Sequence, residues 1–293
     1  MAYTLAFLAA ASFALGSVLQ QKGTLETRAL EGDPRFLAEI LRRPVWLAGG
    51  VCQMLGWILQ AVALDRGSLI VVQSITTLSL VLALPLGRRL TNQSVTSRTW
   101  LGASGVVVGI VLFLAVGSPE GGIENPSMST WWRAIVATLV IIGFVVLVAR
   151  NRRGAMRALL FGSAAGVCFA LQASVTKVFV TIVGSGLSSI LHSWTVYVLV
   201  GSAVIGFALQ QSALKTGVLA PAMASSNAVT LFVSVIFGVV IFEEKLFATS
   251  AGSVAAIAGL AIALLGIGVL AGAGAPRTHR DASGAADRTS PVD

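Results

Sequence analysis

The chain has 293 residues, of which 56% are hydrophobic and only 11% are charged. Soluble globular domains carry about 25% charged residues, so this composition excludes an ordinary soluble protein. The formal net charge of +8 could suggest nucleic acid binding, but basic residues also gather in the cytoplasmic loops of membrane proteins. We therefore expect a lipid bilayer around the chain and no nucleic acid partner.

Eight long segments without Asp, Glu, Lys or Arg, together with an apolar segment that has Arg133 near its start, predict nine membrane-spanning helices. A spanning helix needs roughly 20 apolar residues, and the segments are too long for the roughly 10-residue strands of a membrane barrel. The expected fold class is therefore all-α, a polytopic membrane protein. In chain order, the predicted helices are 2–21, 45–64, 67–87, 99–117, 131–149, 157–180, 191–214, 217–241 and 250–272.

The distribution of basic residues predicts how the chain crosses the cell membrane. With the N-terminus outside, sixteen of the 20 Lys and Arg residues fall on the cytoplasmic side. Cytoplasmic loops of membrane proteins carry an excess of such residues, so we expect an outer N-terminus and a cytoplasmic C-terminus. Residues 23–43 are predicted to form a short helix at the inner surface. The four basic residues expected outside are Arg66, Arg133, Lys177 and Lys245.

The two halves of the chain resemble each other at an offset of 150 residues. The offset relates each helix to the fifth helix after it along the chain. Successive helices cross the membrane in opposite directions, so an odd separation means that the two copies would be inverted. Inverted repeats are characteristic of secondary transporters, whose sites lie between the halves near the midplane. The strongest match places Gly56, Leu59, Gln60, Ala63, Leu64, Gly67 and Leu69 opposite Gly206, Leu209, Gln210, Ala213, Leu214, Gly217 and Leu219.

This repeat predicts four parts of the chain. Residues 1–120 form the first transmembrane half, and residues 121–154 form a connector helix with a basic cytoplasmic loop. Residues 155–273 form the inverted second half. Residues 274–293 lack an apolar period and are predicted to be a disordered cytoplasmic tail.

Several short motifs add a resemblance to a known family. They are Leu19–Gly23, Trp46–Gly50, Ala63–Leu64, Ser174–Lys177, Ala213–Leu214, Ala220–Pro221 and Phe242–Leu246. These segments resemble the drug/metabolite transporter (DMT) superfamily, in particular its EamA-like and NIPA-type branch of magnesium transporter-like proteins. The resemblance covers about residues 5–272, and it implies a transporter built from two inverted repeats.

One departure from the magnesium-transporting branch concerns carboxylates. That branch tends to have an acidic residue where this chain has Gly56-Trp57, and a proline near Gln73. Magnesium sheds water reluctantly and favours carboxylate ligands, yet no predicted span contains Asp or Glu. We therefore expect a secondary transporter of a small metabolite or drug, with a NIPA-like divalent cation transporter as the alternative.

Polar residues within the spans identify candidate substrate-binding residues, because polar groups inside a membrane usually face a cavity or a partner helix. Two polar belts, one on the third and one on the eighth predicted helix, would line one central cavity. A solute would cross the membrane through this cavity by alternating access. The alternative is that they are hydrogen-bonding contacts between helices. The candidates are Gln60, Gln73, Thr76, Thr77, Lys177, Gln210, Ser225, Ser226 and Asn227.

Three further residues are candidates for gating or coupling. Lys22 lies at the end of the first helix, where reaching toward headgroups is the alternative role. His192 could carry protons, although an interfacial histidine can also be purely structural. Glu243 ends the eighth helix and could gate the outer side or pair with Lys245.

The sequence predicts no metal site, no cofactor and no enzyme activity. The two cysteines are Cys52 and Cys168, both within apolar segments, and neither a nucleotide-binding loop nor a clustered catalytic set is present. A membrane enzyme or a non-transporting scaffold is the remaining alternative. The pairs Gly105–Gly109 and Gly268–Gly272 would permit close helix packing within the chain or in a homodimer.

Overall fold

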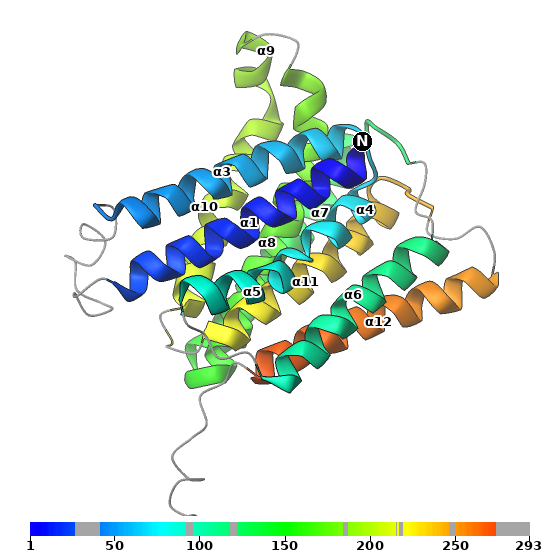
Figure 1. The fold of residues 1–293 in the computed structure, drawn as a ribbon. Helices are drawn as coiled ribbons and strands as arrows, with labels where there is room; N and C mark the ends of the chain where they lie inside the picture. The colour runs from blue at the N-terminus through cyan, green and yellow to red at the C-terminus, as the bar shows by residue number, and fades with distance from the viewer. Residues whose placement is uncertain are drawn as a thin grey trace, which may run out of the picture.

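A computed structural model describes residues 1–26, 42–91, 96–117, 122–183, 187–214, 216, 219–245 and 250–273. The elements of these residues are α-helices, which confirms the predicted all-α class (Figure 1). In chain order they are α1 (Ala2–Leu25), α3 (Pro44–Asp65), α4 (Leu69–Thr76), α5 (Ser79–Leu90), α6 (Ser97–Gly117), α7 (Met128–Arg150), α8 (Gly154–Ile182), α9 (Leu187–His192), α10 (Trp194–Leu214), α11 (Leu219–Val240) and α12 (Ser250–Ala273).

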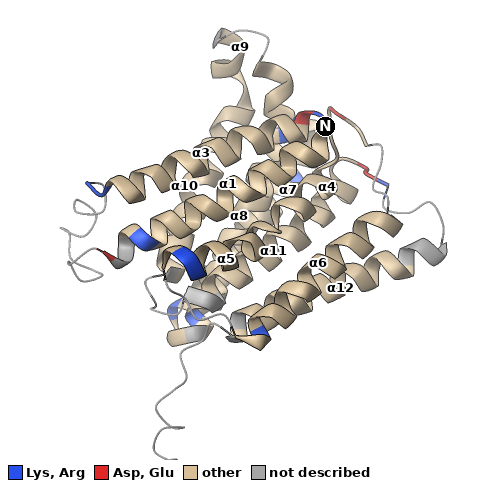
Figure 2. Cartoon of the chain, in the orientation of Figure 1, with Lys and Arg blue, Asp and Glu red and all other residues tan. Residues whose placement is uncertain are grey.

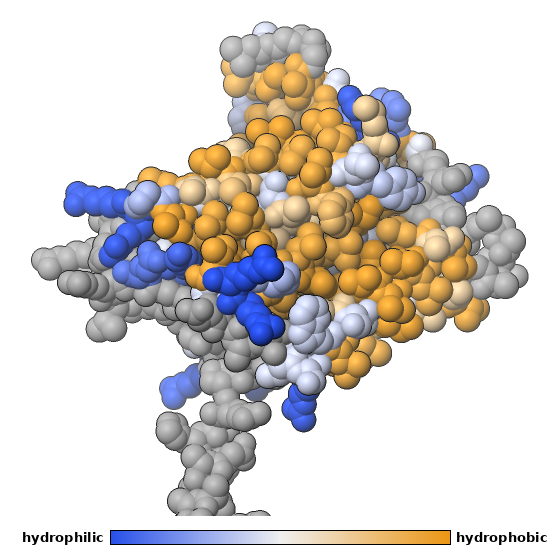
Figure 3. All heavy atoms as spheres, viewed as in Figure 1, coloured by the Kyte–Doolittle hydropathy of each residue, from blue (hydrophilic) through white to orange (hydrophobic). Residues whose placement is uncertain are grey.

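The chain is a polytopic membrane protein. Eight helical stretches are long and apolar enough to cross a bilayer, and Val254–Leu270 within α12 adds a shorter apolar helix. Large apolar side chains cover the outside of the bundle, as at Val51, Val140 and Leu265, which are 70%, 65% and 71% exposed (Figure 3). Apolar surface on this scale is stable where lipid, and not water, surrounds it.

The third predicted helix contains an irregular turn. α4 ends at Thr76 and α5 begins at Ser79, but Thr77 and Leu78 between them keep right-handed helical angles, and Leu69–Leu90 is one apolar stretch. The hydroxyls of Thr76 and Thr77 lie 3.1 and 2.9 Å from the carbonyl oxygen of Gln73. Such side chains compete with the backbone for helical hydrogen bonds, which favours an irregular turn.

Two other helices differ from their predictions. The helix predicted over 217–241 is observed as α11, Leu219–Val240, and Pro221 lies in its first turn, where a missing N–H disturbs no helical bond. The helix predicted over 191–214 is divided at Ser193 into α9 and α10. The predicted surface helix over 23–43 falls mostly, and the predicted tail from 274 entirely, outside the described residues.

The helices pack as pairs. α1 lies along α3, α8 lies along both α10 and α11, and α7 contacts α8. The short α4 contacts α1 and α11, and all eight of its residues are buried. The side chain of Ser68 caps this helix by accepting from the Val71 N–H at 3.1 Å. α4 is therefore a short helix held inside the bundle by its neighbours.

α6 and α12 form a separate pair that lies at one side of the bundle (Figure 1). A Cβ added at Gly109 would come within 2.6 Å of Gly259 O, and one at Gly266 within 2.7 Å of Gly102 O. Only glycine permits backbones to approach this closely. Intrachain packing therefore uses the first predicted glycine pair.

The second predicted glycine pair does not form part of this contact. A Cβ at Gly268 or Gly272 would meet no described atom within 4 Å. These residues lie on a different side of α12 from Gly266, so the expected close packing at this pair is wrong within the chain. The homodimer remains a prediction.

Candidate functional site

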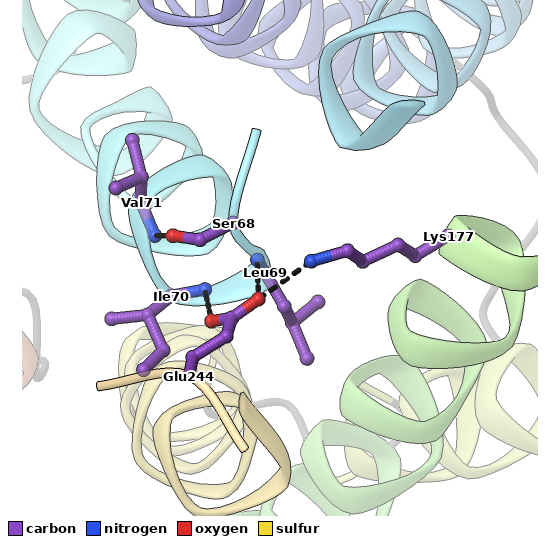
Figure 4. A network of polar contacts seen from close by, with 6 residues as sticks. All are labelled: Ser68, Leu69, Ile70, Val71, Lys177 and Glu244. Atoms are coloured by element: carbon purple, nitrogen blue, oxygen red, sulfur yellow. Dashed lines mark hydrogen bonds and ion pairs between the residues drawn. The ribbon is translucent and has the colours of Figure 1, made fainter. Parts of the chain in front are cut away.

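A buried carboxylate lies at the N-terminus of α4 (Figure 4). Glu244 is 2% exposed. One of its oxygens, Oε1, accepts from the Leu69 N–H at 2.6 Å, and Oε2 accepts from the Ile70 N–H at 3.0 Å. Helix N-termini attract anions because their first N–H groups have no helical partner. Glu244 thus satisfies two buried backbone donors that would otherwise be unpaired.

Lys177 completes this contact from α8. Its Nζ lies 2.6 Å from Glu244 Oε1, and the two side chains are 13% and 0% exposed. The same ammonium lies 4.7 Å from the centre of the Phe242 ring, a favourable cation–π distance. Lys177 is five residues from the end of α8, so it lies about 7–8 Å inside that end of the helix.

The segment after α11 places Glu244 by reversing the chain. Glu243 has φ 54°, in the left-handed region that is uncommon for residues other than glycine. The Glu244 N–H then bonds back to Gly238 O at 2.9 Å. A Cβ at Gly238 would lie 2.7 Å from Glu244 Oε2, so glycine leaves room for the carboxylate.

The loop before α7 covers the other side of this segment. Gly122, with φ +107°, packs so tightly that a Cβ would lie 2.9 Å from Phe242 O. The Ile123 N–H donates to the same oxygen at 2.7 Å. Trp131 packs beneath Phe242 and Trp194, with ring centroids 6.0 and 5.2 Å away. The ion pair therefore lies against an aromatic cluster that adds two further helices, α7 and α10.

Gln73 forms a second polar group on α4. Its Oε1 accepts from Gln60 Nε2 at 3.3 Å and from Thr76 Oγ1 at 3.0 Å. Its Nε2 is buried and has no hydrogen-bond partner among the described residues. A buried amide donor without an acceptor is uncommon in folded proteins and calls for an explanation.

The second half of the chain holds an equivalent contact. Gln210 Nε2 lies 3.0 Å from Met223 Sδ, and these two residues follow Gln60 and Gln73 by 150 positions. The buried Oε1 of Gln210 has no partner among the described residues. Glutamines 150 positions apart therefore each contact the next helix along the chain, Gln60 from α3 to α4 and Gln210 from α10 to α11.

The remaining polar residues of the predicted belts mostly bond their own helices. Ser225 Oγ donates to Ala222 O at 3.1 Å, and Asn227 Nδ2 donates to Met223 O at 2.8 Å. Ser226 and Thr77 are buried, at 5% exposure each. α4 and α11 do contact each other, so the two belts occupy neighbouring helices. Their predicted role in binding a substrate remains a prediction.

The three predicted gating residues do not meet at this site. Lys22 is half-buried near the far end of α1, among the basic residues at one end of the bundle (Figure 2). His192 is exposed, and its Nδ1 lies 2.8 Å from Ser188 O in its own helix. Glu243 is exposed, and its neighbour Glu244 is the buried carboxylate. A gating role of Glu243 remains a prediction, and Glu244 was not among the predicted site residues.

A pocket of about 430 Å³ lies elsewhere, between the start of α8 and the end of α10. It is at the basic end of the bundle, whereas the Glu244 contact is near the opposite end of α8. Its lining contains none of the predicted site residues. The lining residues are Arg153, Gly154, Arg157, Phe161, Ser212 and Thr216.

Two known proteins are similar to the chain over most of its length. An uncharacterized protein of Corynebacterium glutamicum is 27% identical over 249 residues, covering 84% of this chain and 86% of that protein. The probable magnesium transporter NIPA9 of Arabidopsis thaliana is 21% identical over 266 residues, covering 87% of this chain and 77% of that protein. No family model and no solved structure matches the chain.

The similarity to a transporter and the many apolar helices together support a membrane transporter. The expectation of a protein that is not an enzyme is consistent with this similarity. Among the described residues, no three His, Cys, Asp or Glu side chains form a group that could hold a metal ion.

Proposed function

We propose that this protein is a DMT-type secondary transporter that moves a small solute by alternating access. The observation that carries the proposal is the Lys177–Glu244 contact on the first turn of α4. Ionised groups inside a membrane bundle are costly and usually serve a transport path. This contact joins α4, α8 and the segment after α11, so its opening would free three elements at once.

The polar groups at both ends of α4 support the same function. This short helix lies between the Glu244 contact at its start and the threonine hydroxyls at its end. Gln60, Gln73 and Thr76 lie along this helix as candidate contacts of the solute.

Alternating access requires two halves that can exchange roles. The 150-residue offset, the equivalent Gln60–Gln73 and Gln210–Met223 contacts, and the pairing of α6 with α12 are all expected of inverted repeats. In this arrangement α7 would be the connector that inverts the second half.

Divalent cation transport is the second candidate, because the chain is similar to the probable magnesium transporter NIPA9. The geometry favours it less. The buried carboxylate of Glu244 already receives two N–H groups and an ammonium. Magnesium demands several oxygen ligands in octahedral geometry, and a positively charged surrounding would repel it.

Uptake by the purified protein in liposomes tests this proposal. We expect saturable uptake of at least one small organic solute above protein-free liposomes, and weak or absent uptake of magnesium. The solutes should include acids, amides and amines of similar size. Saturable magnesium uptake with no organic solute transported would favour the second candidate.

A further inference from the structure

We infer that Lys177 and the first turn of α4 form a binding site for the carboxylate of a small organic acid. Glu244 occupies this site as a tethered competitor (Figure 4). The inference rests on the proposed transport function and names the substrate class. It assigns to Glu244 the role of a gate that the substrate displaces.

The donors of this site all come from outside the segment that carries Glu244. Leu69 and Ile70 each donate a backbone N–H to a different carboxylate oxygen, at 2.6 and 3.0 Å. Lys177 adds a charged donor from α8 at 2.6 Å. Backbone N–H groups at a helix N-terminus together with an ammonium form a general receptor for anions. A free carboxylate presents the same two oxygens as Glu244.

Gln73 is an independent sign of a ligand. Its side chain is 3% exposed, and its Nε2 has no partner among the described residues. Gln60 Nε2 donates to its Oε1 at 3.3 Å, and the single hydroxyl proton of Thr76 is shared between that oxygen and Gln73 O. Gln73 follows Leu69 by four residues, so it lies on the same face of α4 about 6 Å further along the axis.

These two features define the chemistry of the ligand. One end is a carboxylate, which would replace that of Glu244 beside Lys177. An oxygen that accepts a hydrogen bond would lie about 6 Å away, the four-residue rise along α4, where Gln73 can donate to it. Short dicarboxylic acids such as glutarate have this form, because several carbons separate their two oxygen-bearing ends. A cation would meet the ammonium and the positive end of α4, so it is disfavoured.

The tether of Glu244 favours such an exchange. Glu243 holds a left-handed backbone that is disfavoured for a side chain larger than glycine. Release of Glu244 would relieve this conformation. The incoming carboxylate would keep Lys177 paired, so the exchange leaves no buried charge uncompensated.

Chemical rescue of a Glu244→Ala variant tests the proposal on the full purified chain in detergent. Glu244→Ala removes the tethered carboxylate and should lower the unfolding midpoint. Acetate or propionate should restore the midpoint in a saturable way, and acetamide or chloride at equal concentration should not. Rescue should disappear in the double variant Lys177→Met/Glu244→Ala. Equal responses to acetate and acetamide, or rescue that survives the loss of Lys177, would overturn the proposal.

A milder variant covers the case in which Glu244→Ala does not fold. Glu244→Gln keeps the shape and weakens the competitor, so the wild type should bind glutarate about tenfold more weakly than this variant, as expected for a site that is mostly occupied. The exposed neighbour provides the control, because Glu243→Gln should bind glutarate like the wild type. Equal affinity in all three proteins contradicts the inference.

Liposome uptake separates this inference from the proposed function. If the protein transports a neutral or cationic solute and no organic acid competes, the transport function stands and the carboxylate site is wrong. If no solute is transported but acetate rescues Glu244→Ala, the site stands and the transport function fails.

Discussion

At the scale of single residues, two adjacent glutamates have opposite environments. Glu244 is buried and paired with Lys177, whereas Glu243 is exposed. Removing one partner of a buried ion pair leaves the other charge uncompensated, so Glu244→Gln should destabilise the protein by about 3 kcal/mol. Glu243→Gln changes an exposed side chain and should stay within about 0.5 kcal/mol. Unfolding midpoints of the two variants in detergent check this prediction, and similar losses for both would contradict it.

The Lys177–Glu244 contact should also show energetic coupling. The double variant Lys177→Met/Glu244→Gln leaves no unpaired charge, so its loss of stability should be smaller than the sum of the single losses by about 1–3 kcal/mol. A double-mutant cycle on unfolding free energies measures this difference. Additive losses would mean that the two side chains do not stabilise each other.

Backbone strain at Glu243 predicts a substitution that does not destabilise the protein, in contrast to the two predictions above. A non-glycine residue in the left-handed region costs roughly 1 kcal/mol, which glycine avoids. Glu243→Gly should therefore leave stability unchanged or raise it by up to about 1 kcal/mol, since the unfolded chain gains freedom that offsets part of the relief. Glu243→Val, measured in the same way, should be destabilising. A stabilising effect of valine would show that φ at this position is not positive.

At the scale of helices, the α6–α12 contact requires glycine at Gly266, whereas Gly268 on the same helix lies outside this contact. Gly266→Ala places a Cβ within 2.6 Å of the backbone nitrogen of Val106, so we expect a loss of about 1–3 kcal/mol from overpacking. Gly268→Ala is the matched control, because no described atom lies within 4 Å of its Cβ. Unfolding midpoints compare the two, and equal stability of both variants would contradict the observed packing.

Helices and site differ in how far the sequence predicts them. Membrane spans such as α1 and α6 can be predicted from uninterrupted apolar segments, because only the local composition of the sequence is required. Lys177 was predicted as a site residue because a long uncharged segment follows it, which suggested a position inside the bundle. Glu244 was missed because its burial depends on the chain reversal at Glu243, a tertiary feature that no local pattern encodes.

The polar belts show the other limit of sequence reasoning. Thr76 and Asn227 were expected to face a cavity, yet each bonds a group on its own helix. Hydroxyl and amide side chains can satisfy themselves locally, so their presence in a span does not by itself identify a transport path. Gln73 and Gln210 differ from these residues, because the amide Nε2 of Gln73 and the Oε1 of Gln210 have no partner among the described residues.

At the scale of the whole molecule, the basic residues predict its orientation. In the structure, Lys and Arg gather at one end of the bundle (Figure 2). In a variant without Cys52 and Cys168, a cysteine at Glu124 should react with an impermeant reagent from outside the cell. A cysteine at Arg152 should react only after permeabilisation, and both positions are exposed in the structure. The reverse labelling pattern would contradict the predicted topology.

The central claim is that this bundle transports a solute through a path controlled by Lys177 and Glu244. The most direct test is uptake in liposomes by the wild type, Lys177→Met and Glu243→Gln, each first checked for folding and insertion. We expect saturable uptake by the wild type and by Glu243→Gln, and little uptake by Lys177→Met. Undiminished uptake by a folded Lys177→Met protein, or no uptake of any solute by the wild type, would contradict this account.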